Sequence, residues 1–141
     1  MSEPLPKIRP SSPSDFAAIT ALLAPSVAAR QLLERTDDEM LTLIENGFVA
    51  LEDDRIIGFC AVEIYSRKLG EIQGLTVDPE YRSRGVGRRL VMRCVERARE
   101  RDIHELMAIT ATEELFADCG FYYALPEQKR ALFIHPQETG E

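Results

Sequence analysis

Two glycines at the start of a predicted helix carry the most specific chemical signal in the sequence. Gly85 and Gly87 follow a strand-like segment and a turn at Asp78-Pro79. Four arginines lie near them: Arg82, Arg84, Arg88 and Arg89. The first amide N–H groups of a helix lack partners, the helix dipole adds partial positive charge, and glycine lets an anion approach the backbone. The segment therefore predicts a diphosphate site; a glycine-rich helix start that binds nothing is the alternative.

The spacing around these glycines differs from two well-known phosphate motifs. A P-loop requires Gly-Lys-Ser/Thr, and no such string follows at the required spacing. The dinucleotide fingerprint requires a third glycine at the position that Leu90 occupies. A phosphate-binding loop of another kind is therefore expected.

The net charge hides a strongly basic stretch. The chain has 17 Lys and Arg against 24 Asp and Glu, for a net charge of −7. Residues 82–101 hold eight arginines and two glutamates, so this stretch carries +6 and the remainder −13. Such a concentration of positive charge predicts an anionic partner. Nucleic acid is one alternative, but the acidic remainder and the lack of interleaved aromatic residues argue against it.

Strands and helices alternate along the chain in a way that could position this loop. Periodicity and turn residues predict strands at 7–9, 48–51, 56–65, 71–77, 105–109, 121–124 and 131–135. They predict helices at 16–23, ended by Pro25, and at 86–101 and 112–118, with another that begins at the Thr36/Glu39 capping box. Residues 26–35 are left open between a loop and a short helix. We therefore expect an α/β (α+β) fold with a mixed, largely antiparallel sheet of six to seven strands and about four flanking helices.

The composition is typical of a globular domain, with 141 residues, 45% of them hydrophobic and 29% charged. We expect one domain over residues 1–141, with an ordered core at about 5–135 and a tail at 136–141. No apolar run reaches the ~20 residues that span a bilayer, and no signal peptide is expected. Three cysteines without a C-x-x-C pair favour a reducing cytoplasm, and the two histidines show no metal-ligand spacing.

The string Arg82-x-x-Gly85-x-Gly87, preceded by Val77-Asp78-Pro79-Glu80-Tyr81, resembles the acetyl-CoA motif of the GNAT N-acetyltransferases. The likeness extends from Ile8-Arg9-Pro10 to residues 116–121, in order. It implies a GNAT-like sheet in which the strand before the loop splays from its neighbour. It also implies acetyl-CoA as co-substrate. The implied cofactor-binding residues are Leu75, Thr76 and Val77, along the pantetheine arm, and Arg82, Ser83, Arg84, Gly85, Val86, Gly87 and Arg88, around the pyrophosphate.

The family's reaction, direct attack of an amine on the acetyl thioester, needs a neutral amine. Because an amine with a pKa of roughly 8 to 10 is mostly protonated at pH 7, a base helps. Family members with a catalytic glutamate carry it at the position of Glu71, which makes Glu71 the candidate base; a purely structural carboxylate is the alternative. Phe116 stands where many members carry a tyrosine general acid. Tyr65, Tyr122, Tyr123 or solvent could serve instead.

A narrower likeness concerns Leu33-Glu34-Arg35-Thr36, Gly70-Glu71 and Leu125-Pro126-x-x-Lys129. These strings resemble the acetyltransferase domain of N-acetylglutamate synthases, whose substrate is the α-amine of glutamate. The likeness implies that Arg35 and Lys129 bind the substrate carboxylates; a solvated surface charge is the alternative for each. The charge of −13 outside the basic stretch instead favours cationic amines.

The leading hypothesis is therefore an acetyl-CoA-dependent N-acetyltransferase that acts on the primary amine of a small molecule, glutamate or another amino acid being favoured. A CoA-binding regulatory module without catalysis is the alternative, and a nucleic-acid-binding protein is a weaker one. Expected partners are acetyl-CoA and a small amine, with no nucleic acid, membrane or metal. Dimers are common in the family, so a homodimer is also considered.

Overall fold

Apolar residues in the central strands point alternately to the two faces of one sheet, and each face is covered by helices. The structure is a computed structural model, which describes residues 5–110, 112–122 and 136–138. Five strands form the sheet in chain order: β1 (Lys7–Pro10), β2 (Gly47–Glu52), β3 (Arg55–Ile64), β4 (Leu69–Val77) and β5 (Glu105–Met107). All neighbours are antiparallel except β4 and β5, which are parallel.

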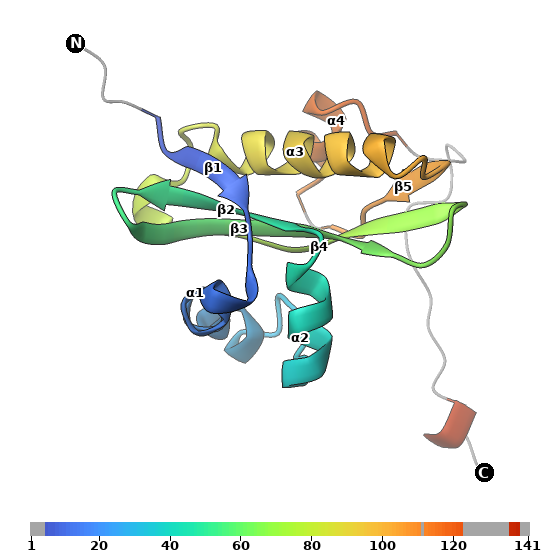
Figure 1. Cartoon of the computed structure of the whole chain (residues 1–141), viewed down its shortest axis with the longest axis horizontal. Coiled ribbons are helices and arrows are strands. Elements are labelled where there is room, and N and C mark those ends of the chain that lie inside the picture. The colour runs from blue at the N-terminus through green and yellow to red at the C-terminus, as the bar shows by residue number, and fades with distance from the viewer. Residues whose placement is uncertain (1–4, 111, 123–135, 139–141) are drawn as a thin grey trace.

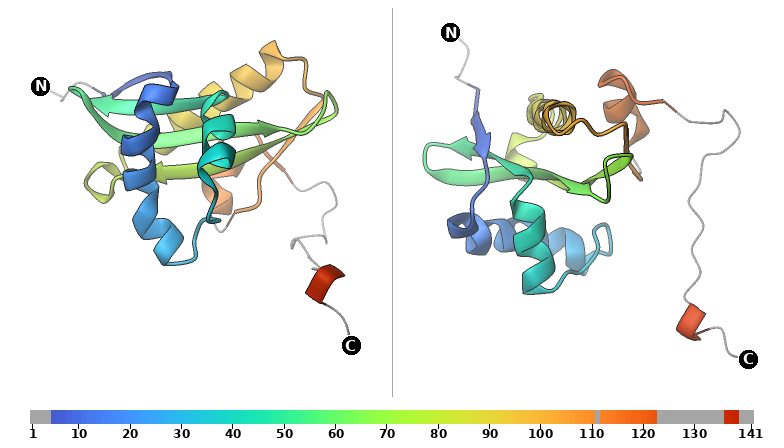
Figure 2. Two further views of the ribbon diagram at one scale, coloured as in Figure 1. Left: turned by 60° about the horizontal axis from the view of Figure 1, so that its bottom comes forward. Right: turned by 45° about the vertical axis from the view of Figure 1, so that its right-hand side comes forward.

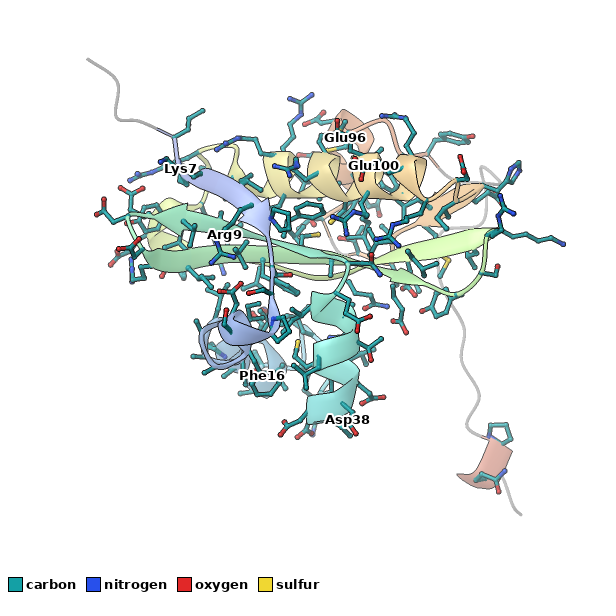
Figure 3. All side chains as sticks on the ribbon, in the orientation of Figure 1. Lys7, Arg9, Phe16, Asp38, Glu96 and Glu100 are labelled. Atoms are coloured by element: carbon teal, nitrogen blue, oxygen red, sulfur yellow. The ribbon has the colours of Figure 1, made fainter. Side chains whose placement is uncertain are left out.

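The helices lie in two layers on opposite faces of the sheet (Figure 1). The α-helices are α1 (Phe16–Ala28), α2 (Asp37–Ile44), α3 (Val86–Glu100) and α4 (Glu113–Asp118), and the 3-10 helices are η1 (Pro13–Asp15), η2 (Pro79–Tyr81) and η3 (Pro136–Glu138). Helices α1 and α2 cover one face, and α3 and α4 cover the other (Figure 2). Asp38 of α2 and Glu96 and Glu100 of α3 accordingly lie on opposite sides of the sheet (Figure 3).

The two layers divide the core into two clusters. Phe59 and Ala61 of β3 pack with α1 and α2, whereas Cys60 and Val62, the residues between and after them, pack with α3. Because successive strand residues face opposite sides, this alternation buries both faces of the sheet. The central strands are thereby fixed in position, and they hold β4 and the loop that follows it.

The expected fold class is confirmed, and its strand count differs in one respect. The described sheet has five strands; of the two strands expected at 121–124 and 131–135, only residues 121 and 122 are described, and they form no strand. The capping box at the start of α2 is also confirmed, since the Glu39 amide donates to Thr36 Oγ1 and the Thr36 amide to Glu39 Oε1. Among the helices of the described residues, none is long and apolar enough to cross a membrane.

The expectation that Pro25 ends the first helix is wrong. Helix α1 continues through Pro25 to Ala28. A proline inside a helix leaves the carbonyl four residues earlier, here that of Ala21, without its N–H donor. Ala21 and Pro25 are both exposed, so water can reach this carbonyl and bond to it. The helix therefore extends further toward the connection that carries Arg35.

A buried carboxylate joins β1 to the beginning of α1. Asp15 accepts two hydrogen bonds from the Arg9 guanidinium, at 2.8 and 2.9 Å, and one from the Ser12 amide at 2.9 Å. The hydrogen bond from Arg9 is the main cause that lowers the pKa of Asp15 below its ordinary value. A lowered folded-state pKa stabilises the protein above the unfolded-state pKa, and this contribution is lost as the pH falls through the folded-state pKa.

We therefore expect Asp15→Asn to lower the free energy of unfolding at pH 7 by about 1–3 kcal/mol. The difference from the wild type should shrink as the pH falls below about 4, because Asp15 of the unfolded wild type then takes up a proton that the folded protein binds less readily. Urea unfolding at pH 7 and pH 3 measures both effects. A difference that stays constant between these pH values would contradict the assigned role of the charge.

Candidate active site

The loop between β4 and α3 ends in backbone amides that have no partner within the helix. In this loop Ser83 and Gly85 adopt left-handed conformations, with φ of 65° and 80°. A Cβ atom at Gly85 would meet no described atom within 4 Å. The Arg89 amide donates to the Gly85 carbonyl at 3.1 Å. Since this is the first bond along α3, the amides of residues 86–88 remain available for an anion.

The edge of β4 next to this loop is open. The parallel ladder joins Leu69–Glu71 to Glu105–Met107 and then stops, although β4 continues to Val77. Leu75, Thr76 and Val77 therefore have no strand partner on this edge within the described part of the chain. The splay expected between β4 and its neighbour is thus present. An open strand edge of this kind can hydrogen-bond an extended ligand chain.

A bulge in β4 lies just before these residues. Phe59 of β3 pairs with Thr76 and Ala61 pairs with Gln73, so β4 has one residue more than β3 between the two pairs. Gly74 takes a φ of 70° here, and a Cβ atom on it would lie 3.1 Å from the Phe59 ring. The bulge changes which residues face each side, so that Gln73 and Thr76 do not follow one simple alternation.

The basic stretch divides into two parts with different surroundings. Arg82 donates from Nε to the Val77 carbonyl at 3.2 Å, beside the loop. Arg89 instead donates to the Pro6 carbonyl at 2.7 Å, and the guanidinium groups of Arg93 and Arg97 lie 4.8 and 5.0 Å from the centre of the Phe48 ring. Arg89, which was expected to add positive charge near the glycines, therefore contacts the residue before β1, and Arg93 and Arg97 pack α3 against β2.

Glu71 lies on β4 before the bulge, so the bulge separates it from the open edge and the loop. Its side chain is buried, with 8% of the residue exposed, and its Oε1 accepts a hydrogen bond from the Tyr65 hydroxyl at 2.6 Å. Burial and the bond to this carboxylate raise the pKa of Tyr65 well above its ordinary value, so the tyrosine stays protonated and acts as a donor. Glu63 of β3 pairs directly across from Glu71.

Arg35 lies in the connection before α2, and its side chain reaches the part of β4 that carries Glu71. Its Nη2 donates to Gln73 Oε1 at 2.6 Å. Its Nη1 is buried and has no hydrogen-bond partner among the residues that the structure describes. A buried guanidinium nitrogen without an acceptor is costly unless a ligand supplies one. Lys129, the other expected carboxylate-binding residue, lies outside the described residues.

One continuous groove joins these two halves, with a volume of about 1930 Å³. Its walls include the open edge of β4 and the loop at one end, and Glu71, Gln73 and Arg35 at the other. All the expected site residues that the structure describes line this groove except Arg84, whose guanidinium lies 5.2 Å from the centre of the Tyr81 ring.

Comparison with known proteins identifies the family. The sequence pattern of the acetyltransferase (GNAT) family matches residues 17–125. The chain belongs to the GNAT acetyltransferase family. It is an N-acetyltransferase, and its acyl donor is acetyl-CoA.

Three relatives illustrate the GNAT assignment. An amino-acid acetyltransferase of Mycobacterium tuberculosis is 29% identical over 82% of this chain and 68% of its own length. A Mycobacterium tuberculosis structure in complex with CoA is 29% identical, with a TM-score of 0.74 over 82% of this chain and 70% of that one. The N-acetylglutamate synthase of Neisseria gonorrhoeae, in complex with coenzyme A and N-acetyl-glutamate, is 30% identical, with a TM-score of 0.77 over 89% of this chain. The chain spans 31% of that synthase.

The residues that could act as general acid in this GNAT enzyme lie in different surroundings. Phe116, at the position where many family members have a tyrosine, is buried and packs edge-to-face on Phe121, with ring centres 5.2 Å apart. Tyr65 directs its proton to Glu71. Tyr122 is 90% exposed, and Tyr123 lies outside the described residues.

Two features of the site were not predicted from the sequence. These are the bond between Arg35 and Gln73 and the bond between Tyr65 and Glu71. The spacing of Glu71 and Gln73, two residues apart on a strand, was the signal that could have placed their side chains on one face. Their partners, Arg35 and Tyr65, come from other segments of the chain, and no local sequence pattern indicates these bonds.

Proposed function

We propose that this enzyme acetylates the α-amine of a free amino acid, with glutamate favoured. The observation that carries the proposal is the buried Nη1 of Arg35, which lacks a hydrogen-bond partner among the described residues and lines the same groove as Glu71. A carboxylate on the acceptor would supply the missing hydrogen-bond acceptor through a charge-assisted bond. The relatives named for amino acids and for N-acetylglutamate support this choice.

We further propose that Glu71 is the base. Acetyl-CoA supplies the activated acetyl thioester. The acceptor arrives largely as an ammonium ion, and the Glu71 carboxylate takes one proton from it, directly or through water. The neutral nitrogen then forms the amide bond as the carbon–sulfur bond breaks. The nitrogen releases its second proton to solvent, and the thiolate takes up a proton from solvent. Burial and the Tyr65 hydroxyl hold the carboxylate in one place in the part of the groove that Arg35 and Gln73 also line.

The half of the groove beside the open edge of β4 and the loop, here called the donor half, supports the assignment of the acetyl-CoA-binding residues. Residues 75–77 present the open strand edge to the pantetheine arm, and residues 82–88 present amides and arginines to the diphosphate. A side chain on Gly87 would grow toward Leu115 and Val77, which would then lie 3.6 and 3.8 Å from its Cβ atom. The space kept open by this glycine supports a ligand that passes between β4 and α4.

The second carboxylate of glutamate would bind Lys129 under this proposal. The half of the groove that Arg35 and Gln73 line, here called the acceptor half, also contains five glutamates: Glu34, Glu39, Glu45, Glu63 and Glu71. These residues disfavour a second negative charge unless Lys129 offsets it. Glutamine, which has a single carboxylate, is therefore the natural comparison for glutamate. The boundaries of the domain, a homodimer and a cytoplasmic location stay predictions.

The role of Arg35 is tested by replacing it with methionine. Because a carboxylate would lose a charge-assisted hydrogen bond, Arg35→Met should lower kcat/KM for amino-acid acceptors by about 10- to 100-fold. Arg30→Met is the matched control, since Arg30 lines the same groove. Thiol release from acetyl-CoA measures both variants. Equal losses in the two variants would contradict the proposed carboxylate site.

A further inference from the structure

Gln73 lies on the same face of the sheet as Glu71, the face that α1 and α2 cover. Its register partner is Ala61, and the register partner of Glu71 is Glu63. Because paired residues of neighbouring strands point to the same side, Gln73 and Glu71 face the side on which Ala61 packs with α1 and α2. The connection that carries Arg35 leads into α2 on this side (Figure 2). Both the candidate base and Gln73 therefore face the segment that carries Arg35.

The bulge at Gly74 makes this placement compatible with the donor half of the groove. Leu75 and Val77, two and four residues after Gln73, pack against the cluster beneath α3, on the opposite face. In a regular strand, alternation would place all three residues on one face. The extra residue of the bulge shifts the alternation. One strand can thus direct Gln73 toward Arg35 and still pack its last residues beneath α3.

The hydrogen bond between Arg35 and Gln73 joins a full charge to an uncharged group. Arg35 Nη2 donates to Gln73 Oε1 at 2.6 Å, and within residues 5–110, 112–122 and 136–138 no carboxylate forms an ion pair with Arg35. A carboxamide oxygen can hold a guanidinium in place, but it leaves the charge of the guanidinium uncompensated. Nη1 of the same group is buried and has no hydrogen-bond partner in this part of the chain. Arg35 therefore keeps both a charge and a donor for a ligand.

A carboxylate at position 73 would act differently. A guanidinium and a carboxylate commonly form two parallel N–H···O bonds. Such a side chain would therefore take Nη1 together with Nη2 and compensate the charge, which would leave nothing for the substrate. The uncharged side chain of Gln73 avoids this competition.

We propose that Gln73 is the positioning residue that makes Arg35 specific for an α-carboxylate. This rests on the function proposed above. Gln73 fixes the guanidinium through Nη2, so that Nη1 stays in place for the substrate, and its lack of charge keeps Arg35 attractive to an anion. The residue at position 73 thereby determines whether the acceptor half prefers amines with an α-carboxylate or amines without one.

Gln73→Glu tests this inference, because it keeps the length of the side chain and adds a charge. L-glutamine and L-glutaminamide differ only in the α-carboxylate, and thiol release gives kcat/KM for both. The wild type should prefer the acid. Gln73→Glu should lower the ratio of kcat/KM between acid and amide by about tenfold or more, chiefly through a higher KM for the acid. The intrinsic difference in reactivity between the two amines cancels when the enzymes are compared.

Gln73→Met removes the hydrogen-bond acceptor of Arg35 without adding a charge. It should raise KM for the acid by about 3- to 10-fold and leave KM for the amide unchanged, because the guanidinium stays charged but is no longer held. Gln31→Glu is the matched control. It adds the same charge to another residue that lines the groove and whose side chain has no hydrogen bond to Arg35, so it should keep the wild-type ratio.

A rise in Tm with acetyl-CoA shows that each variant folds, since the residues proposed to bind acetyl-CoA are unchanged. If folded Gln73→Glu keeps the wild-type ratio, or if Gln73→Met affects the acid and the amide alike, the role of Gln73 is overturned while the acetylation of amino acids stands. If Gln73→Glu does not fold, the result for Gln73→Met decides. If the wild-type full chain releases no thiol with either amine, or does not prefer the acid, the proposed carboxylate site itself fails, and this inference fails with it.

Discussion

Replacement of Glu71 by glutamine is expected to lower kcat at neutral pH by about 10²- to 10⁴-fold, the range for loss of a general base. The amide has the size of the carboxylate but cannot accept a proton from the ammonium ion. Above the pKa of the acceptor amine, at roughly 8 to 10, the substrate deprotonates without help and the variant should regain much of its activity. A pH profile of kcat from pH 6 to pH 10 measures both effects.

The matched control for this prediction is Glu63→Gln. Glu63 pairs directly across from Glu71 on β3, so the same charge is removed from the neighbouring position of the sheet. We expect its kcat to stay within a few-fold of the wild type. If the two variants lose activity equally, or if Glu71→Gln keeps the wild-type pH profile, Glu71 is a structural carboxylate and the base lies elsewhere.

The second large effect is expected at Gly87, where Glu should abolish binding of acetyl-CoA. The new side chain would enter the space between Leu115 and Val77, and its charge would lie beside the amides proposed for the diphosphate. The wild type should be stabilised by about 2.7 kcal/mol when acetyl-CoA is present at 100 times its Kd. The variant should show no rise in Tm under the same conditions. Differential scanning fluorimetry with and without acetyl-CoA measures the shift.

Two controls separate the causes of this loss. A Cβ atom at Gly87 would meet Leu115 and Val77 only at ordinary contact distances of 3.6 and 3.8 Å, so Gly87→Ala should fold and retain most of the shift. Gly87→Gln has the bulk of glutamate without its charge, and it should retain an intermediate shift. A full Tm shift in Gly87→Glu would place the diphosphate elsewhere.

Local sequence signals predicted the parts of the fold that depend on neighbouring residues. The capping box of Thr36 and Glu39 marked the start of α2, and the apolar stripe of α3 marked a helix whose bounds differ by one residue from those observed. The prediction from Pro25 was wrong because the cost of a proline inside a helix depends on exposure, and only the folded helix shows that Ala21 and Pro25 are both exposed. The short β5 differed because its length depends on where it leaves β4.

One part of the site could be predicted from the sequence, and the other part could not. Gly85 and Gly87 form a contiguous motif, so the loop could be found from the sequence. The second half of the groove is assembled from segments far apart in the chain, and the bond from Arg35 to Gln73 joins residues 38 positions apart. Sequence spacing also could not show that Arg89 and Arg93 contact β1 and the residues before it, because those contacts exist only after α3 packs on the sheet.

The most direct test of amino-acid acetylation is a panel of amine acceptors with the full chain and acetyl-CoA, read as release of free thiol and confirmed by the mass of the product. The panel contains amino acids, led by L-glutamate and L-glutamine, together with polyamines and peptide amines. Free amino acids should have the highest kcat/KM and gain about 42 Da on the α-amine, the mass of an acetyl group less the hydrogen that it replaces. Faster acetylation of polyamines, or of peptide amines, than of every free amino acid would contradict it.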